Sequence, residues 1–241
     1  MRIVVAEYPK SGGTWIVGML GDALRLPKRD IYISDQHPWL EGSSKGIDLR
    51  RHPWFADSAS LNLTDSCVIK SHELPNSPLT KFPARFIHLI RDGRDVVVSK
   101  YFYEKDFCVA NGIYERFDVS FEDYVAQVTL EWRNYVLAWL KCGLATFKYE
   151  DFLRDTRNTL RSVLDELGLT VEDAELQHAI DANTKAKLRQ ALDKAHKYNT
   201  FIRKGIAGDW KQYFNAENVR VFKELAGDAL IQLGYENSSR W

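Results

Sequence analysis

Residues 3–15 read IVVAEYPKSGGTW. The apolar, mostly β-branched start of this stretch, residues 3–6, predicts a buried strand, and apolar residues at helical spacing follow its end. Between the strand and the helix lie Lys10 and the glycine pair Gly12 and Gly13. Glycines let the backbone approach anionic oxygens closely, and a helix N-terminus offers unpaired N–H groups. The stretch therefore predicts a strand, an anion-binding loop and a helix. An ordinary glycine-containing turn with a solvated lysine is the alternative.

Three more short runs rich in β-branched or aromatic residues predict strands, at residues 67–70, 85–90 and 145–149. Longer segments with helical spacing lie between and after them. This alternation predicts a single α/β domain over residues 1–241, with a central parallel sheet flanked by helices on both faces.

Local signals place some boundaries of the other elements. Ser120 is expected to cap one helix, and Asn215 is expected to cap a C-terminal helix that stops at Gly234. Residues 31–66 are rich in His, Pro, Trp, Ser and Asp without clear periodicity. We expect long loops there, and loops of this length often carry function.

The composition excludes several classes of function. The formal net charge of the 241 residues is +0, so no overall field would attract nucleic acid or an anionic membrane. The three cysteines, Cys67, Cys108 and Cys142, fit neither a disulfide framework nor a zinc site, and they favour a reducing, cytoplasmic location. The apolar run at the N-terminus is too short for a signal peptide or a membrane span. Composition gives no indication of the oligomeric state.

Polar side chains follow all four predicted strands. Lys10 follows the first strand, His72 the second, Arg91 the third and Glu150 the fourth. In parallel α/β sheets, ligands bind outside the carboxyl ends of the strands. The sequence therefore predicts one charged site along this edge of the sheet.

Three motifs resemble those of one family. YPKSGGTW at residues 8–15 resembles the 5'-phosphosulfate-binding loop of sulfotransferases that use 3'-phosphoadenosine 5'-phosphosulfate (PAPS), usually YPKSGTTW, with Gly13 in place of the first threonine. RDGRDVVVS at residues 91–99 resembles the 3'-phosphate motif of that family. RKGIAGDWK at residues 203–211 is similar to its RKGxxGDWK segment. Their order and spacing indicate a PAPS-dependent sulfotransferase.

The resemblance implies a P-loop nucleotide-kinase-like fold, PAPS as sulfuryl donor, 3'-phosphoadenosine 5'-phosphate (PAP) as product, and no metal. Arg91 and Arg203 can each offer forked donors to a 3'-phosphate, and Phe201 is expected to pack on the adenine. Thr184 falls where the family has a TSF-like contact, although the serine and phenylalanine are missing. The candidate cofactor-binding residues are Lys10, Ser11, Gly12, Gly13, Thr14, Trp15, Arg91, Ser99, Tyr149, Thr184, Phe201, Arg203, Lys204 and Gly205.

The candidate catalytic residues follow from the same resemblance. His72 corresponds to the histidine of the family's KTH segment, which acts as the base, and an unperturbed histidine titrates near neutral pH. Lys10 corresponds to the lysine that stabilises the bridging oxygen as the S–O bond breaks. Lys70 is a second cation for the same site, with burial of its stem in the strand as the alternative. Ser99 is the fourth candidate catalytic residue.

Several alternatives remain open. Arg91 and Arg94 can instead form a surface ion-pair cluster with Asp92 and Asp95. Rival functions are a P-loop kinase-like phosphoryl transferase, which needs a Walker-type lysine and a magnesium carboxylate, a non-catalytic nucleotide-binding module, and a scaffold without a ligand.

The acceptor stays open within the class of small molecules, including carbohydrates, phenols, lipid alcohols and natural products. Aromatic side chains hint at a flat or apolar acceptor, and packing in the core is an equal alternative for each. They are Tyr32, His37, Trp39, Trp54, Phe55, Tyr101, Phe102, Tyr103 and Phe107.

Overall fold

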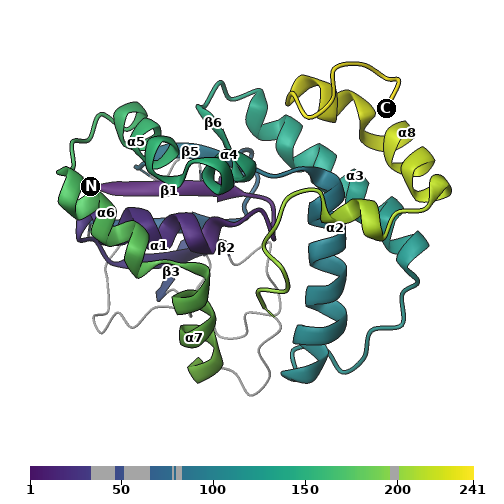
Figure 1. Ribbon diagram of the computed structural model, residues 1–241, viewed down its shortest axis with the longest axis horizontal. Coiled ribbons are helices and arrows are strands. Elements are labelled where there is room, and N and C mark those ends of the chain that lie inside the picture. Colours follow the sequence, from purple (N-terminus) through teal and green to yellow (C-terminus); the bar gives the residue numbers. More distant parts are fainter. Residues whose placement is uncertain (34–46, 52–65, 78, 80–82, 196–200) are drawn as a thin grey trace.

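The computed structural model describes residues 1–33, 47–51, 66–77, 79, 83–195 and 201–241. These residues form a six-stranded sheet with the order β3-β2-β4-β1-β5-β6 (Figure 1). Five strands run parallel, and β3 at the edge runs antiparallel to β2. The strands are β1 (Arg2–Glu7), β2 (Lys28–Ile33), β3 (Ile47–Arg51), β4 (Cys67–Ser71), β5 (Arg85–Ile90) and β6 (Thr146–Lys148). The prediction of an α/β fold with a central parallel sheet is confirmed.

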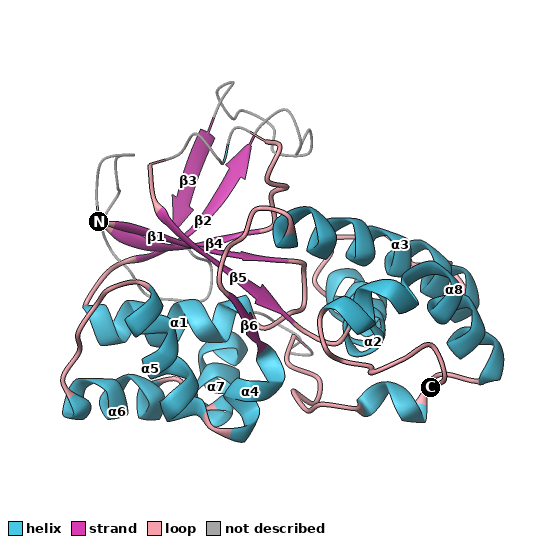
Figure 2. Ribbon diagram, turned by 90° about the horizontal axis from the view of Figure 1, so that it is seen from above, coloured by secondary structure: helices cyan, strands magenta, loops and turns pink. Residues whose placement is uncertain are grey.

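Helices form two groups around this sheet. Figure 2 shows α1, α5 and α6 together on one side of the sheet, and α2, α3 and α8 grouped at the other end of the molecule. The helices are α1 (Gly13–Leu24), α2 (Gly93–Phe102), the π-helical segment Tyr103–Cys108, α3 (Phe121–Leu140), α4 (Tyr149–Arg154), α5 (Thr156–Glu166), α6 (Asp173–Ala182), α7 (Lys185–Ala195), the 3-10 turn Asp209–Gln212 and α8 (Ala216–Gln232).

The central strand β1 is buried on both faces. Ile3 and Val5 pack in a cluster with α1, α5 and α6, whereas Val4 and Ala6 pack in a second cluster with α3 and α8. Successive side chains of a strand point to opposite faces, so a strand covered on both sides is apolar over most of its length. This explains the continuous apolar run that follows Arg2.

The helix caps match the sequence signals. The Ser120 side chain accepts the Asp123 N–H at 3.1 Å, and Asn215 forms a capping box with Asn218. Gly234, directly after the C-cap of α8, has a φ of 67°. Both predicted starts and the predicted stop are therefore confirmed.

Two expectations about strands need correction. Residues 31–66 were expected to form loops, but they contain the end of β2 and the whole of β3. β3 reads IDLRR and is the edge strand, so it needs no continuous apolar run to pair with β2. The fourth strand is also shorter than expected, since Tyr149 begins α4. The remaining parts of the predicted loop, residues 34–46 and 52–65, lie outside the described residues.

Candidate functional site

A cavity of about 690 Å³ opens at the carboxyl ends of the parallel strands. Its wall combines the loop after β1, the residues after β4 and β5, the start of α4, the π-helical segment and residues 201–206. All predicted site residues line it except Ser11 and Thr184. The predicted residues in the wall are Lys10, Gly12, Gly13, Thr14, Trp15, Lys70, His72, Arg91, Ser99, Tyr149, Phe201, Arg203, Lys204 and Gly205.

The loop after β1 has an unusual backbone. Gly12 has a φ of 103°, and Lys10 has a φ of 73°, a conformation that a residue with a side chain rarely adopts. Arg91 Nη1 donates to the Lys10 carbonyl at 3.2 Å and so ties the loop to the end of β5. Strained backbone that persists in a folded protein is found mostly at functional sites.

The Tyr149 ring leaves no room for a side chain at position 12. A Cβ atom at this position would lie 2.5 Å from Cδ2 of Tyr149, whose ring lines the same cavity. We expect Gly12→Ala to lower the free energy of unfolding by about 1–3 kcal/mol, measured by urea titration. Gly112→Ala is the matched control, because Gly112 has a φ of 70° and nothing within 4 Å of its added Cβ. Equal losses in both variants would mean that the Tyr149 contact contributes nothing.

Glu7 is a site residue that the sequence reasoning missed. Its side chain is 3% exposed, lines the cavity, and accepts the Gly13 N–H at Oε2 over 2.6 Å. Burial raises the pKa of Glu7 to about 7, while nearby Lys70 and Lys10 oppose that shift. Two features of the sequence could have indicated it. A glutamate ends an otherwise apolar strand, and a glycine stands at position 13, where the family motif has threonine.

Lys10 lies among aromatic rings. Its ammonium group is 3.9 Å from the centre of the Phe201 ring and 4.1 Å from that of Tyr103, and it donates to the Phe201 carbonyl at 3.2 Å. Burial lowers the pKa of Lys10 to about 7, and the positive charge of Arg91 adds to this shift. An anion bound beside Lys10 would favour its charged form.

His72 has one ring nitrogen fixed by the backbone. Its Nδ1 lies 2.9 Å from the carbonyl oxygen of Glu7. A carbonyl can only accept, so Nδ1 carries the hydrogen and a neutral His72 keeps its lone pair on Nε2. Lys70, two residues earlier, has its ammonium group 3.3 Å from Asp30 on β2.

Arg91 and Arg203 contact the segment after residue 200. Arg91 Nη2 donates to the Ile206 carbonyl at 3.0 Å, and Arg203 donates to the Tyr213 hydroxyl at 2.8 Å. Arg203 and Lys204 also share the buried carboxylate of Asp209. Arg91, Arg203 and Lys204 all line the cavity.

The ion-pair alternative holds for both arginines, since Arg91 Nη2 lies 3.9 Å from the Asp95 carboxylate and Arg94 pairs with Asp92. Arg94 is buried, pairs with Asp92 and Glu236, and lies between the rings of Trp210 and Trp241. It does not line the cavity, whereas Arg91 does. Arg94 therefore has a structural role, whereas Arg91 is paired with Asp95 and also faces the cavity, where a ligand can reach it.

Some buried donors in the described part of the chain have no hydrogen-bond partner. They include Ser11 Oγ in the loop, Arg91 Nε and Arg203 Nε. A buried polar atom without a partner costs about 1–3 kcal/mol, which acceptor oxygens of a ligand would offset. Two guanidinium groups with spare donors, beside Lys204, fit a doubly phosphorylated nucleotide.

Lys185 lines the cavity in place of its neighbour Thr184. Its ammonium group donates to the carbonyl oxygens of Lys204 at 2.8 Å and Gly205 at 2.9 Å. Thr184 lies outside the wall, and its hydroxyl faces the Lys187 N–H at the start of α7. The structure thus supplies no cavity contact at Thr184. Ser11, which is part of the loop, is buried and likewise does not line the cavity.

Of the aromatic acceptor candidates, Tyr103 and Phe107 line the cavity. Tyr101 and Phe102 instead pack against other aromatic rings in and around the core, and the side chains of Tyr32, His37, Trp39, Trp54 and Phe55 lie outside the described residues. Ile113 and Tyr114, which the sequence reasoning did not select, are partly exposed and also line the cavity.

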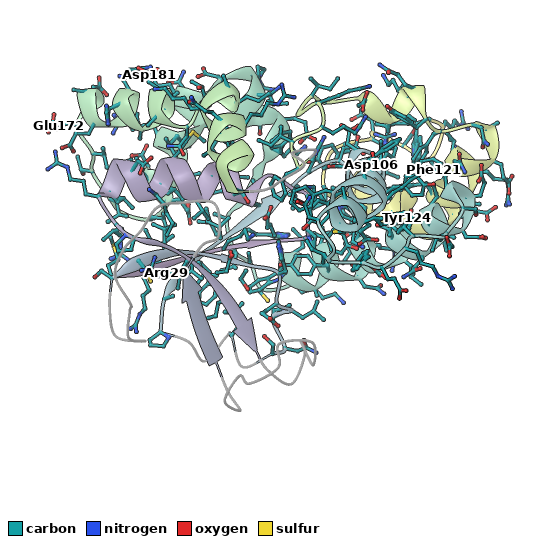
Figure 3. The ribbon with its side chains drawn as sticks, turned by 90° about the horizontal axis from the view of Figure 1, so that it is seen from below. Arg29, Asp106, Phe121, Tyr124, Glu172 and Asp181 are labelled. Atoms are coloured by element: carbon teal, nitrogen blue, oxygen red, sulfur yellow. The ribbon has the colours of Figure 1, made fainter. Side chains whose placement is uncertain are left out.

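Helix α3 braces the π-helical segment that carries Tyr103 and Phe107. Figure 3 labels Tyr124 of α3 and Asp106 of that segment. The Tyr124 hydroxyl donates to Glu104 Oε2 at 2.7 Å, which holds the two elements together. π-Helical turns inside helices occur frequently at functional sites.

Two kinds of feature are absent from the described residues. No group of three or more His, Cys, Asp or Glu side chains there is arranged to hold a metal ion. Within the same residues, no helix combines the length and the apolar character that crossing a membrane requires.

Comparisons with known proteins agree on one family. A family profile described as "Sulfotransferase domain" matches residues 1–234. The chain is similar to human Sulfotransferase 2A1, with 26% identity covering 97% of this chain and 86% of the relative, and to rat Sulfotransferase 2A6, with 26% identity covering 92% and 82%.

Solved structures show the same fold. Mouse sulfotransferase SULT7A1 complexed with PAP superposes with a TM-score of 0.68 at 19% identity, covering 97% of this chain and 86% of that chain. Retinol dehydratase in complex with androsterone and inactive cofactor PAP gives 0.67 at 18% identity, covering 95% and 80%.

Proposed function

The chain belongs to the sulfotransferase family, and from this membership we propose that it moves a sulfuryl group from PAPS to a hydroxyl or amine acceptor in the cavity around Lys10. It is a PAPS-dependent enzyme, and PAP is the expected product. The observation that carries the proposal is the meeting of Lys10, His72 and Arg91 at one cavity.

Two groups of cavity residues would bind the two charged ends of the cofactor. Residues 10–15 would hold the phosphosulfate through loop N–H groups, and Arg91, Arg203, Lys204 and Ser99 would hold the 3'-phosphate. The unpartnered Nε atoms of both arginines support this assignment. When bound, PAPS supplies the activated sulfuryl group and a stable leaving group.

His72 is the proposed base. With Nδ1–H directed at the Glu7 carbonyl, Nε2 can accept the proton of an acceptor hydroxyl as that oxygen attacks. The backbone hydrogen bond fixes the ring and the tautomer together. His72 therefore needs no carboxylate to orient it.

Lys10 is the proposed stabiliser of the leaving group. Its ammonium group can turn from the Phe201 carbonyl to the charge that develops as the S–O bond breaks. Lys70 adds a second cation, which Asp30 holds in position. Because charge builds up only during the reaction, such contacts favour the transition state over the bound substrate.

The acceptor is expected to be a small molecule with one apolar side. Tyr103, Phe107, Ile113 and Tyr114 give the cavity an aromatic and aliphatic rim, which suits a phenol, a lipid alcohol or a natural product better than a bare sugar. We also place the enzyme in the cytoplasm. Its exposed free thiol at Cys142 supports a reducing compartment.

Calorimetric titration with PAP, beside ATP and AMP, tests the cofactor. We expect micromolar binding of PAP and little of the other two, with Arg91→Ala weakening PAP by about 10- to 100-fold because a hydrogen bond to a charged group contributes about 1.5–3 kcal/mol. Arg133→Ala is the matched control, since Arg133 pairs with Asp228 and does not line the cavity. Preference for ATP would favour the kinase-like alternative. Binding of PAP without turnover would favour the non-catalytic one.

A further inference from the structure

Position 13 is where the loop departs from the YPKSGTTW form, and a carboxyl group occupies the space of the missing side chain. A Cβ atom added to Gly13 would lie 2.2 Å from Glu7 Oε1 and 2.3 Å from Cδ. These distances are too short for two atoms that are not bonded. The Glu7 side chain can therefore take this position only because residue 13 is a glycine.

The Glu7 carboxyl also occupies a donor that the loop would offer to an anion. Gly13 is the first residue of α1, and the first N–H groups of a helix have no partner within it. Such groups bind phosphate oxygens in loops of this kind. Glu7 Oε2 takes the Gly13 N–H at 2.6 Å, so a bound phosphosulfate and Glu7 compete for one donor.

The surroundings of Glu7 allow its charge to change. Burial raises the pKa of Glu7 to about 7, the positive charges of Lys70 and Lys10 oppose this shift, and the charge of Asp30 adds to it. The titratable groups that face the carboxyl are Lys70 of β4, Asp30 of β2, Lys10 of the loop, Tyr135 of α3, and His72, whose ring contacts the Glu7 backbone.

We infer that Glu7 is a proton-linked positioning residue of the cofactor loop, which holds the Gly13 N–H in the free enzyme and takes up a proton when the phosphosulfate end of the cofactor binds. This inference rests on the proposed function. The added proton removes a negative charge next to an anionic ligand and lets the carboxyl give up the N–H. Without it, a buried carboxylate and a phosphate would repel each other across the loop.

The test is calorimetric titration of PAP at pH 8 in two buffers with different ionisation enthalpies, which gives the number of protons taken up on binding. Glu7→Gln keeps the shape and the acceptor oxygen but cannot gain a proton. We expect this variant to take up close to one proton fewer than the wild type. A change in the protonation of Lys10 cannot produce this decrease in proton uptake. With a pKa of about 7 it is already largely neutral at pH 8, and losing the Glu7 charge would only increase its uptake.

Affinity gives a second readout. If only the protonated form of Glu7 accepts PAP, the competent fraction of the wild type falls about tenfold between pH 6 and pH 8, and the apparent affinity falls with it. The ratio of wild-type to variant dissociation constants should therefore rise about tenfold over this range. A constant ratio, together with equal proton uptake, would overturn the inference.

Two further variants make the experiment decisive. Glu150→Gln is the matched control, because Glu150 is a partly buried carboxyl with a raised pKa that accepts a backbone N–H, from Asp92, yet does not line the cavity. It should leave proton uptake unchanged. If Glu7→Gln does not fold, the double variant Glu7→Ala, Gly13→Ala replaces the carboxyl by methyl groups and carries the same expectation. Failure of the wild type to bind PAP would overturn the proposed function as well, whereas PAP binding with Glu7-independent uptake would overturn this inference alone.

Discussion

Replacing His72 by alanine is expected to lower turnover by about 10²- to 10⁴-fold while leaving the affinity for PAP nearly unchanged. The side chain donates through Nδ1 to the Glu7 carbonyl and faces the same cavity as Lys10, and in the proposed mechanism Nε2 takes the proton of the acceptor. The rate of PAP release from PAPS, measured with the best acceptor from a panel of phenols, sterols and sugars, gives the turnover. Calorimetry with PAP gives the affinity.

The control for this variant is His178→Ala. His178 is an exposed histidine of α6 outside the cavity, and its loss should change neither quantity. Unchanged turnover in His72→Ala would remove His72 from its role as base. A large loss of PAP affinity would instead mean that His72 shapes the cofactor site.

The predicted residues that the structure brings to one cavity share one property, since they follow the ends of buried parallel strands. Lys10, His72 and Arg91 each come directly after an apolar run, and parallel strands bring such positions to one edge. Neither the exact side-chain contacts nor the distances are needed for this inference. Periodicity and the order of the strands suffice.

Residues that act within a strand or across the chain were harder to find. Glu7 ends β1, where a polar residue reads as the end of a strand rather than as part of a site. Its proposed role depends on Gly13, six residues later. Only the three-dimensional structure shows that the Glu7 carboxyl fills the space of a side chain at position 13. The edge strand β3 was missed for a related reason, because its charged residues give no apolar signal.

At the start of α7, the family motif points to a residue that does not line the cavity. Thr184 aligned with the family pattern, yet it is Lys185 that reaches the cavity and binds the backbone of residues 204 and 205. A one-residue difference on a helix turns a side chain by about 100°, which a short degenerate motif cannot resolve. Motifs anchored by a strand end are therefore more dependable than motifs on a helix start.

Replacing Lys10 by methionine is expected to lower turnover by about 10²- to 10³-fold, the usual effect of removing one group that stabilises developing charge. Methionine keeps an unbranched stem that can still pack against Tyr103 and Phe201, so the loss reports on the ammonium group. PAP affinity should fall less, because Lys10 is only partly charged near pH 7 in the free enzyme.

Lys10→Arg separates charge from position. A guanidinium group keeps the charge but cannot lose its proton, so affinity for PAP should become less dependent on pH between 6 and 8 than in the wild type. Turnover should recover only in part, because the forked group is bulkier than the ammonium that lies between two rings. Full activity in Lys10→Met would contradict the assigned role and transfer it to Lys70, an ammonium group of the cavity wall two residues before His72.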